Sequence, residues 1–375
     1  MLAVSIFIAV LYVVLITAFI IGFDSIAPLK VEKHHPKNTF SIVIPFRNEE
    51  QHLPFLLKSL GALNYPQELF EIILVDDDSN DGFQLIFDHF TTQHPKLNLK
   101  LMENLRSSRS PKKDAITTAV NAAKFDWIVT TDADCNVPLD WLFLFNQIIE
   151  EKQALFIGAP VKFREEKSFL YHFQNLHFTS LMGSTIGGFG LKKPFMCNGA
   201  NLCYHKETFV KLNGFEGNAA IASGDDVFLL EKMYQTYPDR TSYLKSTDAI
   251  VETQSVESWR LFFNQQLRWV SKSTAYKNTF CQLVGVIVLL ANLMLIILGI
   301  SSILFSHFWK FFLTLLILKS IVDFALIFRT SCFLRTSKSL KFFVGVNLLY
   351  PFFIVFIGFS SLLRSYTWKG RSYKK

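Results

Sequence analysis

The sequence has few cysteines, and they are not arranged to bind zinc. Five occur in 375 residues, with no Cys-x-x-Cys pair and no histidine partners at zinc-site spacing. The lysines and arginines do not interleave with aromatic residues in a nucleic-acid-binding motif. We therefore expect reduced or buried thiols, a chain that faces the cytoplasm, and no nucleic-acid partner.

Charge is absent from three long stretches of the chain, residues 2–23, 281–306 and 342–363. Each is long enough to cross a hydrocarbon layer of ~30 Å as a helix. A fourth apolar run, residues 311–328, is broken only by Lys319 and Asp323. Four membrane spans are therefore predicted, and the mean hydropathy of +0.27 fits them.

The first span lacks the basic start and small-residue cleavage site of a secretory signal, so a retained anchor over residues 1–24 is predicted. Lysines follow it, which favours a cytoplasmic location for the next segment. The expected protein is integral to the plasma (inner) membrane, with a C-terminal transmembrane region over 280–363. The basic tail, 364–375, also favours the cytoplasm, yet 342–363 looks like a single crossing, so the topology of 342–375 stays open.

The net charge of +7 comes largely from the basic segments beside these spans. Such a surface attracts anionic membrane lipid. Lys319 and Asp323 are four residues apart and can pair on one helix face. They are either a neutralising pair packed against another span or residues that border a path for a lipid acceptor.

Between the first two spans, the sequence alternates strand and helix patterns four times. Short apolar runs rich in β-branched residues predict strands at residues 39–45, 72–75 and 98–102 and at the start of 127–135. Strand–helix repetition predicts an α/β fold with a mainly parallel sheet. Polar residues follow the strands, and ligands bind at the carboxyl ends of such strands. This convergence indicates a nucleotide-binding cleft.

Acidic pairs follow two of these strands. Asp132 and Asp134 are one residue apart, and such carboxylates suit Mg²⁺ or Mn²⁺ shared with a substrate's phosphates. On its own, Asp-x-Asp is as well explained by two turn acids. Asp76 and Asp77 precede Asn80 and Asp81, which are suited to cap the next helix, so Asp76 and Asp77 are available to face a ligand.

Three predicted helices begin with informative residues. Asn48 suits an N-cap. Lys112 and Lys113 oppose the helix dipole, which indicates either a nearby anion or plain solvation. Asp225 and Asp226 precede an apolar helix; Asp225 is either its N-cap or a cleft carboxylate able to take a proton.

The later part of the chain changes character. An aromatic-rich helix is predicted at 168–182, followed by four glycines between 183 and 190 that mark a mobile or tightly packed segment. Residues 256–275 predict an amphipathic helix at a membrane interface. Within it Gln265, Arg268 and Trp269 share one face, which could hold a phosphate, a sugar or an aromatic base.

Five motifs occur in order along the chain: SIVIPFRNEE (41–50), LVDDDSNDG (74–82), TDADC (131–135), GDD (224–226) and QQLRW (265–269). With them, roughly residues 38–275 resemble the membrane-bound family 2 glycosyltransferases. That resemblance implies a GT-A domain over 38–255 and inverting sugar transfer. The sequence departs from the family at GDD, where many relatives have Glu-Asp, and at Asp78, where the family has glycine.

The resemblance also implies roles for individual residues. Asp77 would contact the nucleotide base, with Asp76 beside it, and Pro45, Glu49 and Lys113 would lie on the donor side. Asp134 would bind the metal, with Asp132 near the metal or the sugar. Asp226 or Asp225 would be the general base. Gln265, Arg268 and Trp269 would grip the diphosphate and the acceptor side.

The implied activity is sugar transfer from a nucleotide-sugar, expected to be a UDP-sugar, to a lipid, lipid-linked or glycan acceptor of the cell envelope. It would use a divalent cation at the cytoplasmic membrane face. The alternatives are a processive polysaccharide synthase subunit and, in another class, a transporter or a non-catalytic scaffold. The sequence carries no information on the oligomeric state.

Overall fold

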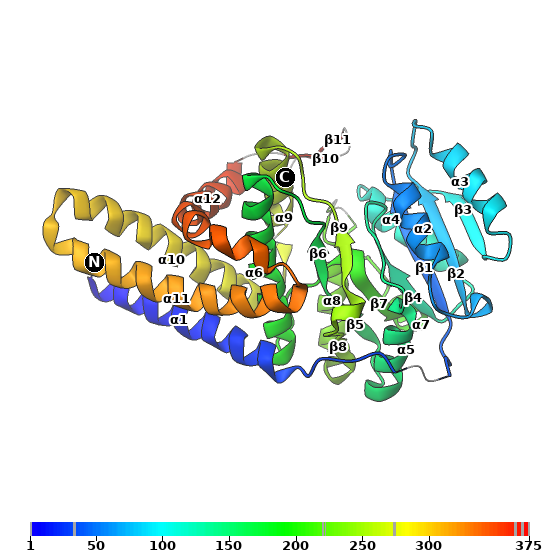
Figure 1. Ribbon diagram of the computed structural model, residues 1–375, viewed down its shortest axis with the longest axis horizontal. Helices are drawn as coiled ribbons and strands as arrows, with labels where there is room; N and C mark the ends of the chain where they lie inside the picture. Colours follow the sequence, from blue (N-terminus) through cyan, green and yellow to red (C-terminus); the bar gives the residue numbers. More distant parts are fainter. Residues whose placement is uncertain are drawn as a thin grey trace. The chain divides into compact units, whose positions relative to one another are not determined.

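The computed structural model describes residues 2–32, 35–219, 221, 223–272, 275–363, 366–368 and 371–373. The chain forms two compact units, shown in Figure 1, which we take one at a time. The sheet unit comprises Ala27–Arg164 and Met196–Gln254. The helical unit comprises Met1–Ile26, Glu165–Phe195 and Ser255–Lys375.

The sheet unit is built on a seven-stranded sheet with the strand order β3-β2-β1-β4-β7-β5-β8. Its strands are β1 (Phe40–Phe46), β2 (Phe70–Asp76), β3 (Leu99–Glu103), β4 (Trp127–Thr130), β5 (Phe156–Gly158), β7 (Leu202–His205) and β8 (Thr241–Tyr243). The first four are mutually parallel where they pair, and only β7 runs antiparallel to its neighbours, β4 and β5. The predicted mainly parallel α/β sheet is confirmed.

The sheet forms where apolar runs can be buried on both faces. β1 and β2 read FSIVIPF and FEIILVD, and most of their residues are fully buried, as is usual for parallel strands covered by helices. The helices of this unit are α2 (Leu53–Gly61), α3 (Phe83–Gln93), α4 (Pro111–Ala122), α5 (Trp141–Lys152), α7 (Lys206–Lys211) and α8 (Asp225–Thr236). A second, two-stranded sheet pairs β6 (Val161–Phe163) with β9 (Val251–Thr253) in parallel.

One charged residue lies inside the main sheet. Glu71 on β2 is fully buried and bonds across both neighbouring strands, at 2.6 Å to the Ser41 hydroxyl and 2.6 Å to the Lys100 ammonium. It also accepts the backbone N–H of Lys124. Burial by itself would raise the pKa of Glu71, but these three donors outweigh burial and lower it.

Glu71→Gln is expected to destabilise the protein by about 2 kcal/mol at pH 7, because a charge-assisted bond to Lys100 is lost. The pKa of Glu71 is lower in the folded than in the unfolded protein. The wild type is therefore more stable than Glu71→Gln above the unfolded pKa of about 4.3, and this difference in stability disappears as the pH falls through the folded pKa. Melting temperatures between pH 7 and pH 3 measure this. The exposed Glu68→Gln is the control, and a gap that stays constant with pH would contradict the assignment.

The α-helices described in the helical unit are α1 (Leu2–Ser25), α6 (Phe169–Gly190), α9 (Trp259–Ser271), α10 (Thr279–Leu304), α11 (Trp309–Leu334) and α12 (Phe343–Leu363). It ends in a hairpin of β10 (Tyr366–Trp368) and β11 (Arg371–Tyr373). Four segments of the described chain are long and apolar enough to cross a membrane, and they are Ala3–Ser25, Thr279–Leu304, Ser306–Leu334 and Ser337–Leu363. These coincide with the four predicted spans.

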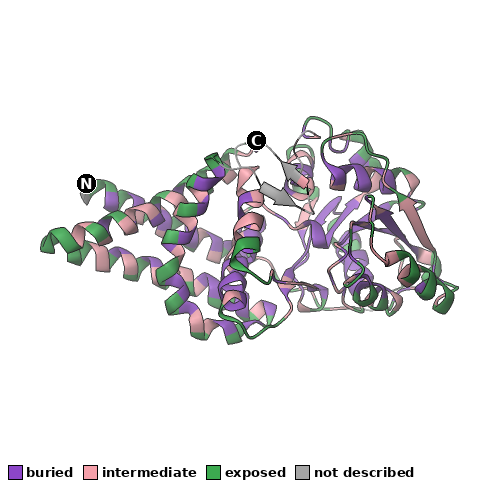
Figure 2. Cartoon of the chain, turned by 90° about the horizontal axis from the view of Figure 1, so that it is seen from above, coloured by how far each residue is buried: buried purple, intermediate pink, exposed green. Residues whose placement is uncertain are grey.

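The outer faces of the long helices are apolar. Figure 2 shows exposed stretches along them. On these helices Phe7, Ile303 and Phe352 are more than half exposed. An exposed apolar face of this extent is suited to lipid contact. The helical unit therefore has the surface of a membrane domain.

The predicted glycine-rich segment is part of α6, which runs on to Gly190. A Cβ at Gly187 would overlap the backbone of Phe19, and one at Gly190 would overlap that of Gly22 on α1. Small residues on one helix face allow such backbone contact between helices. Of the two predicted alternatives, mobile or tightly packed, the structure shows tight packing. Residues 165–195 fall within the range predicted for the glycosyltransferase domain, but they pack in the helical unit.

Candidate active site

Two loops at the carboxyl ends of β1 and β2 are bonded to each other. The backbone N–H of Asn48 donates to the Ser79 hydroxyl at 2.9 Å, and the Asn48 side-chain oxygen accepts from the Asn80 N–H at 2.9 Å. The Glu50 N–H donates to the Asp81 carboxylate at 2.8 Å. These reciprocal bonds fix the position of both loops above the sheet.

This arrangement corrects two predicted caps. Asn48 is not an N-cap, because α2 begins later, after His52, and the Asn48 side chain bonds across to the other loop. The residue before α3 is Gly82 and makes no side-chain cap, so Asp81 is not an N-cap either. In both places a tertiary bond between loops has replaced a local one.

Asp78 adopts a left-handed backbone conformation, with φ of 63°. Glycine adopts this conformation without strain, and this explains why a glycine fits this position in the family that the sequence resembles. The Asp78 carboxylate is exposed and pairs with Arg47 at 3.0 Å. The departure at Asp78 therefore keeps the turn and adds a surface charge.

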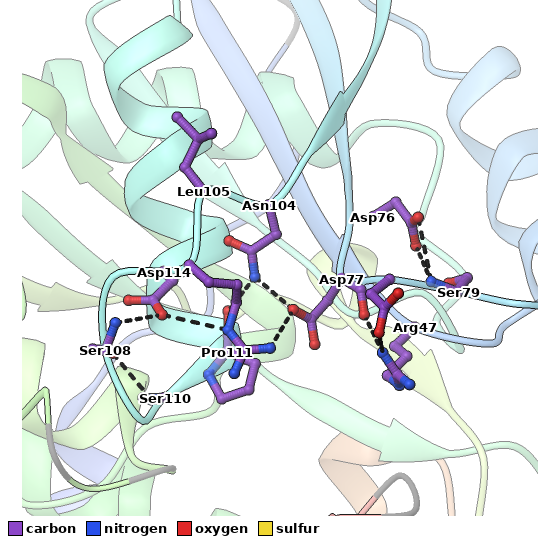
Figure 3. A network of polar contacts seen from close by, with 12 residues as sticks. Arg47, Asp76, Asp77, Ser79, Asn104, Leu105, Ser108, Ser110, Pro111 and Asp114 are labelled. Carbon is purple, nitrogen blue, oxygen red and sulfur yellow. Dashed lines mark hydrogen bonds and ion pairs between the residues drawn. The ribbon is translucent and has the colours of Figure 1, made fainter.

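Asp77 is buried and oriented by residues that follow β3. One oxygen of its carboxylate accepts from the Asn104 amide at 2.7 Å, as Figure 3 shows. The same oxygen accepts from the Arg106 guanidinium at 3.1 Å. The half-buried Asp76 carboxylate instead accepts the Ser79 N–H at 3.0 Å. Asp76 shapes its own turn, while Asp77 belongs to a network that spans two strand ends.

The same network continues into the loop before α4. The buried Asp114 carboxylate accepts from the N–H groups of Ser107 and Ser108, at 3.2 and 2.9 Å, and from the Ser107 hydroxyl at 3.1 Å. Asn104 also donates to the Pro111 carbonyl at 3.0 Å. Sequence reasoning missed Asn104 and Asp114; for Asn104, its position just after a predicted strand was the available signal.

Lys112 lies among acidic side chains at the start of α4. Its ammonium is 2.6 Å from the Asp132 carboxylate and 3.4 Å from that of Asp225. Burial by itself would lower the pKa of Lys112, but the charges of Asp132, Asp225 and Asp226 outweigh burial and raise it. The anion predicted near the start of this helix is thus the protein's own carboxylate cluster.

Lys113, the predicted donor-side lysine, points into the protein instead. Its ammonium is buried and donates at 2.8 Å to the carbonyl and side-chain oxygens of Asn218 and at 3.0 Å to the Ile221 carbonyl. It also lies 4.7 Å from the centre of the Phe228 ring. Lys113 therefore holds the loop that precedes α8, and Lys112 is the lysine placed among the cleft carboxylates.

Asp225 and Asp226 form the first turn of α8. The N-cap residue is Gly224, in the left-handed region with φ of 86°, so Asp225 is not the cap. The Asp226 carboxylate accepts the N–H of Gly199 at 3.3 Å and that of Val227 at 2.8 Å. A Cβ at Gly199 would lie 2.9 Å from the Asp225 carboxylate, so a larger residue here would displace that side chain.

Asp134 is half-buried and has a different set of neighbours. It accepts the Thr253 hydroxyl at 3.2 Å and lies 3.6 Å from the Cys135 thiol. Glu49 is buried beside it and bonds His52 at 2.6 Å. Burial raises the pKa of Asp134, and the Glu49 charge raises it further. The structure gives Asp134 no lysine or arginine partner among the residues that it describes.

These acids fit a divalent cation in part. Across the described ranges, no three His, Cys, Asp or Glu side chains converge on one point as a complete metal site. Mg²⁺, however, is usually held by one or two carboxylates together with substrate phosphates. Asp134 is a half-buried carboxylate beside a second acid, which suits that kind of incomplete site.

The remaining predicted residues lie in two places. Pro45 is near the end of β1, beyond the last residue that pairs with β4. Its missing backbone N–H therefore removes no hydrogen bond between β1 and β4. Gln265, Arg268 and Trp269 lie on α9 of the helical unit, all half-buried. Trp269 contacts the Phe178 ring of α6, with 6.3 Å between ring centres.

A family model of glycosyl transferase family 21 matches residues 4–374. The chain is 24% identical over 233 residues to a probable glycosyltransferase, YdaM, of Bacillus subtilis, covering 61% of this chain and 54% of that protein. It is 30% identical over 101 residues to the beta-monoglucosyldiacylglycerol synthase of Synechocystis, covering 27% and 21%. The chain thus spans about half or less of these relatives.

A solved structure has the same fold over nearly the whole chain. It is the mannosyltransferase PcManGT from Pyrobaculum calidifontis in complex with GDP-Man and Mn²⁺, with a TM-score of 0.55 at 15% identity and 96% of both chains covered. The predicted GT-A fold is confirmed. The matching family model is that of family 21, whereas the sequence resemblance named family 2.

Proposed function

Because the chain belongs to glycosyl transferase family 21, we propose that it moves a sugar from a nucleotide-sugar to a lipid, lipid-linked or glycan acceptor with inversion at the anomeric carbon. The observation that carries this proposal is the cluster of Asp132, Asp225 and Asp226 around Lys112. It brings acids from two distant motifs to one place, beside the carboxyl end of β4.

We assign the nucleotide to the strand ends of β1 and β2. Asp77 is held in a fixed orientation by Asn104 and Arg106, and a fixed carboxylate can accept N–H groups from the edge of a base. The proposed donor is a UDP-sugar. The Pyrobaculum protein was solved with GDP-Man, so both bases belong in the test.

The acceptor hydroxyl loses its proton to Asp226 or Asp225 as its oxygen forms a bond to the anomeric carbon. The bond from that carbon to the diphosphate oxygen breaks in the same step, and the nucleoside diphosphate leaves. One displacement inverts the anomeric centre. Lys112 is placed to meet the negative charge that develops on the leaving diphosphate.

Asp134, with Asp132 nearby, would hold Mg²⁺ or Mn²⁺. Such an ion stabilises negative charge on the leaving diphosphate. Asp132 is paired with Lys112 in this structure, so binding of a cation and donor requires Lys112 to exchange a carboxylate partner for the diphosphate.

Lys112→Met is expected to raise the donor KM about 10- to 100-fold, because one charge-assisted hydrogen bond to the donor is lost. It should also bind Mn²⁺ more tightly when no nucleotide is present, because a competing positive charge is gone. Electron paramagnetic resonance titration measures the second effect independently of activity. Lys96→Met, at an exposed position, is the control; unchanged KM and Mn²⁺ affinity in Lys112→Met would refute the role.

The acceptor is proposed to be a membrane lipid or a lipid-linked glycan. A relative from Aeromonas hydrophila, 36% identical over 100 residues, is an undecaprenyl-phosphate 4-deoxy-4-formamido-L-arabinose transferase. The four candidate spans and the apolar helix faces also support a membrane acceptor. We propose the inner membrane, with the sheet unit on the cytoplasmic side.

The deciding experiment measures donor hydrolysis and transfer by the full chain in detergent. A panel of UDP- and GDP-sugars is tested with Mn²⁺ or Mg²⁺ and with added lipid extract. Cleavage of one donor, lost with EDTA, would support the proposal and name the sugar. If no donor is bound or cleaved with any metal and lipid, the scaffold alternative takes its place.

A further inference from the structure

A buried histidine on α6 connects α9 to the rest of the helical unit. His177 is 5% exposed, and its Nε2 lies 2.9 Å from the side-chain oxygen of Gln266 on α9. Its Nδ1 lies 3.2 Å from the Tyr350 hydroxyl on α12. One imidazole therefore bonds two other helices at once.

The bonding fixes the protonation of this histidine. Burial lowers the pKa of His177 to about 4, so the ring is neutral near pH 7 and has one donor and one acceptor. The Gln266 oxygen can only accept, so Nε2–H donates to it. Nδ1 then accepts the Tyr350 hydroxyl. In these two bonds Tyr350 donates to His177 and His177 donates to Gln266, so the direction of each hydrogen bond is defined.

Tyr350 also packs beside the ion pair that Lys319 and Asp323 form on α11. The Lys319 ammonium lies 5.6 Å from the centre of the Tyr350 ring and 5.4 Å from that of Tyr12. Lys319 bonds Asp323 at 2.6 Å, and the second oxygen of Asp323 accepts the Tyr12 hydroxyl at 2.6 Å. This is the neutralising pair predicted as one alternative. Contacts run from it through Tyr350 and His177 to Gln266 on α9.

Other residues of α6 hold α9 on both sides of this bond. The Gln174 side chain exchanges two hydrogen bonds with the backbone of Val256, at 2.9 and 3.1 Å, just before α9 begins. Phe178, next to His177, contacts the ring of Trp269. α6 thus fixes the approach to α9, its middle, and the tryptophan of the motif.

Gln266 is an unexpected residue for this position. It is 4% exposed, on the face of α9 that also buries Phe262, and its amide nitrogen has no hydrogen-bond partner among the described residues. A buried amide with an unpaired end is costly, and a leucine would avoid that cost. The bond to His177 is the interaction that leucine could not supply.

We propose that His177 is a positioning residue for the Gln-x-x-Arg-Trp segment. By bonding Gln266 it sets the rotation of α9 about its axis, and with it the direction of Gln265, Arg268 and Trp269. The consequence for catalysis rests on the proposed function and on the role that the sequence resemblance implies for these three residues, contact with the donor diphosphate and the acceptor side.

The test compares His177→Phe with His172→Phe. Both replace a buried histidine of α6 by a phenyl ring. Among the described residues, however, His172 contacts the 337–342 segment and not α9: it bonds Ser339 at 3.0 Å and stacks on Phe342. Hydrogen exchange of the α9 amides is measured first, since it requires no activity. We expect exchange in α9 to rise at least tenfold in His177→Phe and not in His172→Phe, with the conservative His177→Gln partly restoring protection.

Kinetics then test the consequence. His177→Phe should raise the donor KM about tenfold and lower kcat less, and Gln266→Leu should add little to it, since both remove one bond. Unchanged α9 exchange in His177→Phe, or an equal rise in His172→Phe, would overturn the positioning role. A wild-type protein without transfer would refute the proposed function instead, and the exchange result would still decide the role of His177.

Discussion

Asp134→Asn is expected to reduce sugar transfer by about 1,000-fold, equivalent to about 4 kcal/mol of transition-state stabilisation. The amide keeps the shape of the side chain but removes the charge that a divalent cation requires. Bonds from Thr253 and Cys135 can still form, so the fold should be retained. Turnover at saturating Mn²⁺ measures the loss, and Mn²⁺ titration in the presence of nucleoside diphosphate measures the binding defect.

Asp140→Asn is the matched control for this experiment. Asp140 follows the same strand and bonds the exposed Asn64 amide at 2.7 Å, so its replacement removes one charge from the same region. Its activity should stay within twofold of wild type. If Asp134→Asn transfers sugar at the wild-type rate, or if both variants lose activity equally, Asp134 is not the metal ligand.

Asp226→Asn is expected to lower kcat by about 100- to 10,000-fold, the usual contribution of a general base. We propose Asp226 rather than Asp225 as the base, because the Asp225 carboxylate is 3.4 Å from Lys112, the side chain that we assign to the donor diphosphate. Asp226 is oriented by the N–H groups of Gly199 and Val227. Donor affinity should change little, since the base acts on the acceptor.

Asp225→Asn separates the two acids. We expect a smaller loss of kcat and a change in donor KM, because the partner of Lys112 is altered. The exposed Asp239→Asn, beyond the end of α8, serves as the control. A larger kcat loss in Asp225→Asn than in Asp226→Asn would identify Asp225 as the general base. The contact between Asp225 and Lys112 would then belong to the donor-free state alone.

The order of the first strands and helices was predictable because these strands are short, mostly apolar runs. β1, β2, β3 and β4 were each expected within a few residues of where they lie, and acids at their carboxyl ends followed from the same pattern. What the sequence could not show is which adjacent residue faces the cleft. Lys112 and Lys113 are about 100° apart on a helix, and only the packing of α4 decides that Lys113 turns inward.

The missed and corrected features share a cause. Asn48 has the chemistry of an N-cap, but the loop after β2 offers a competing partner in the Asn80 N–H. Whether the glycines after residue 182 end α6 or continue it depends on α1, far away in the sequence. Asn104 carries no motif of its own and gains a role only because β2 and β3 are neighbours. Local patterns predict elements, while partners distant in sequence decide side-chain roles.

The glycine contact between α1 and α6 also constrains how the protein is made. Gly22 emerges from the ribosome about 165 residues before Gly187, its neighbour in the folded helical unit. At ~5–20 residues per second, the first helix waits roughly 8–30 s for this partner. During that interval the strands β1 to β4 are synthesised. An inserted α1 would thus tether the growing chain to the bilayer while this part of the sheet unit folds, and the surface that receives α6 would stay open to lipid or to a chaperone until then.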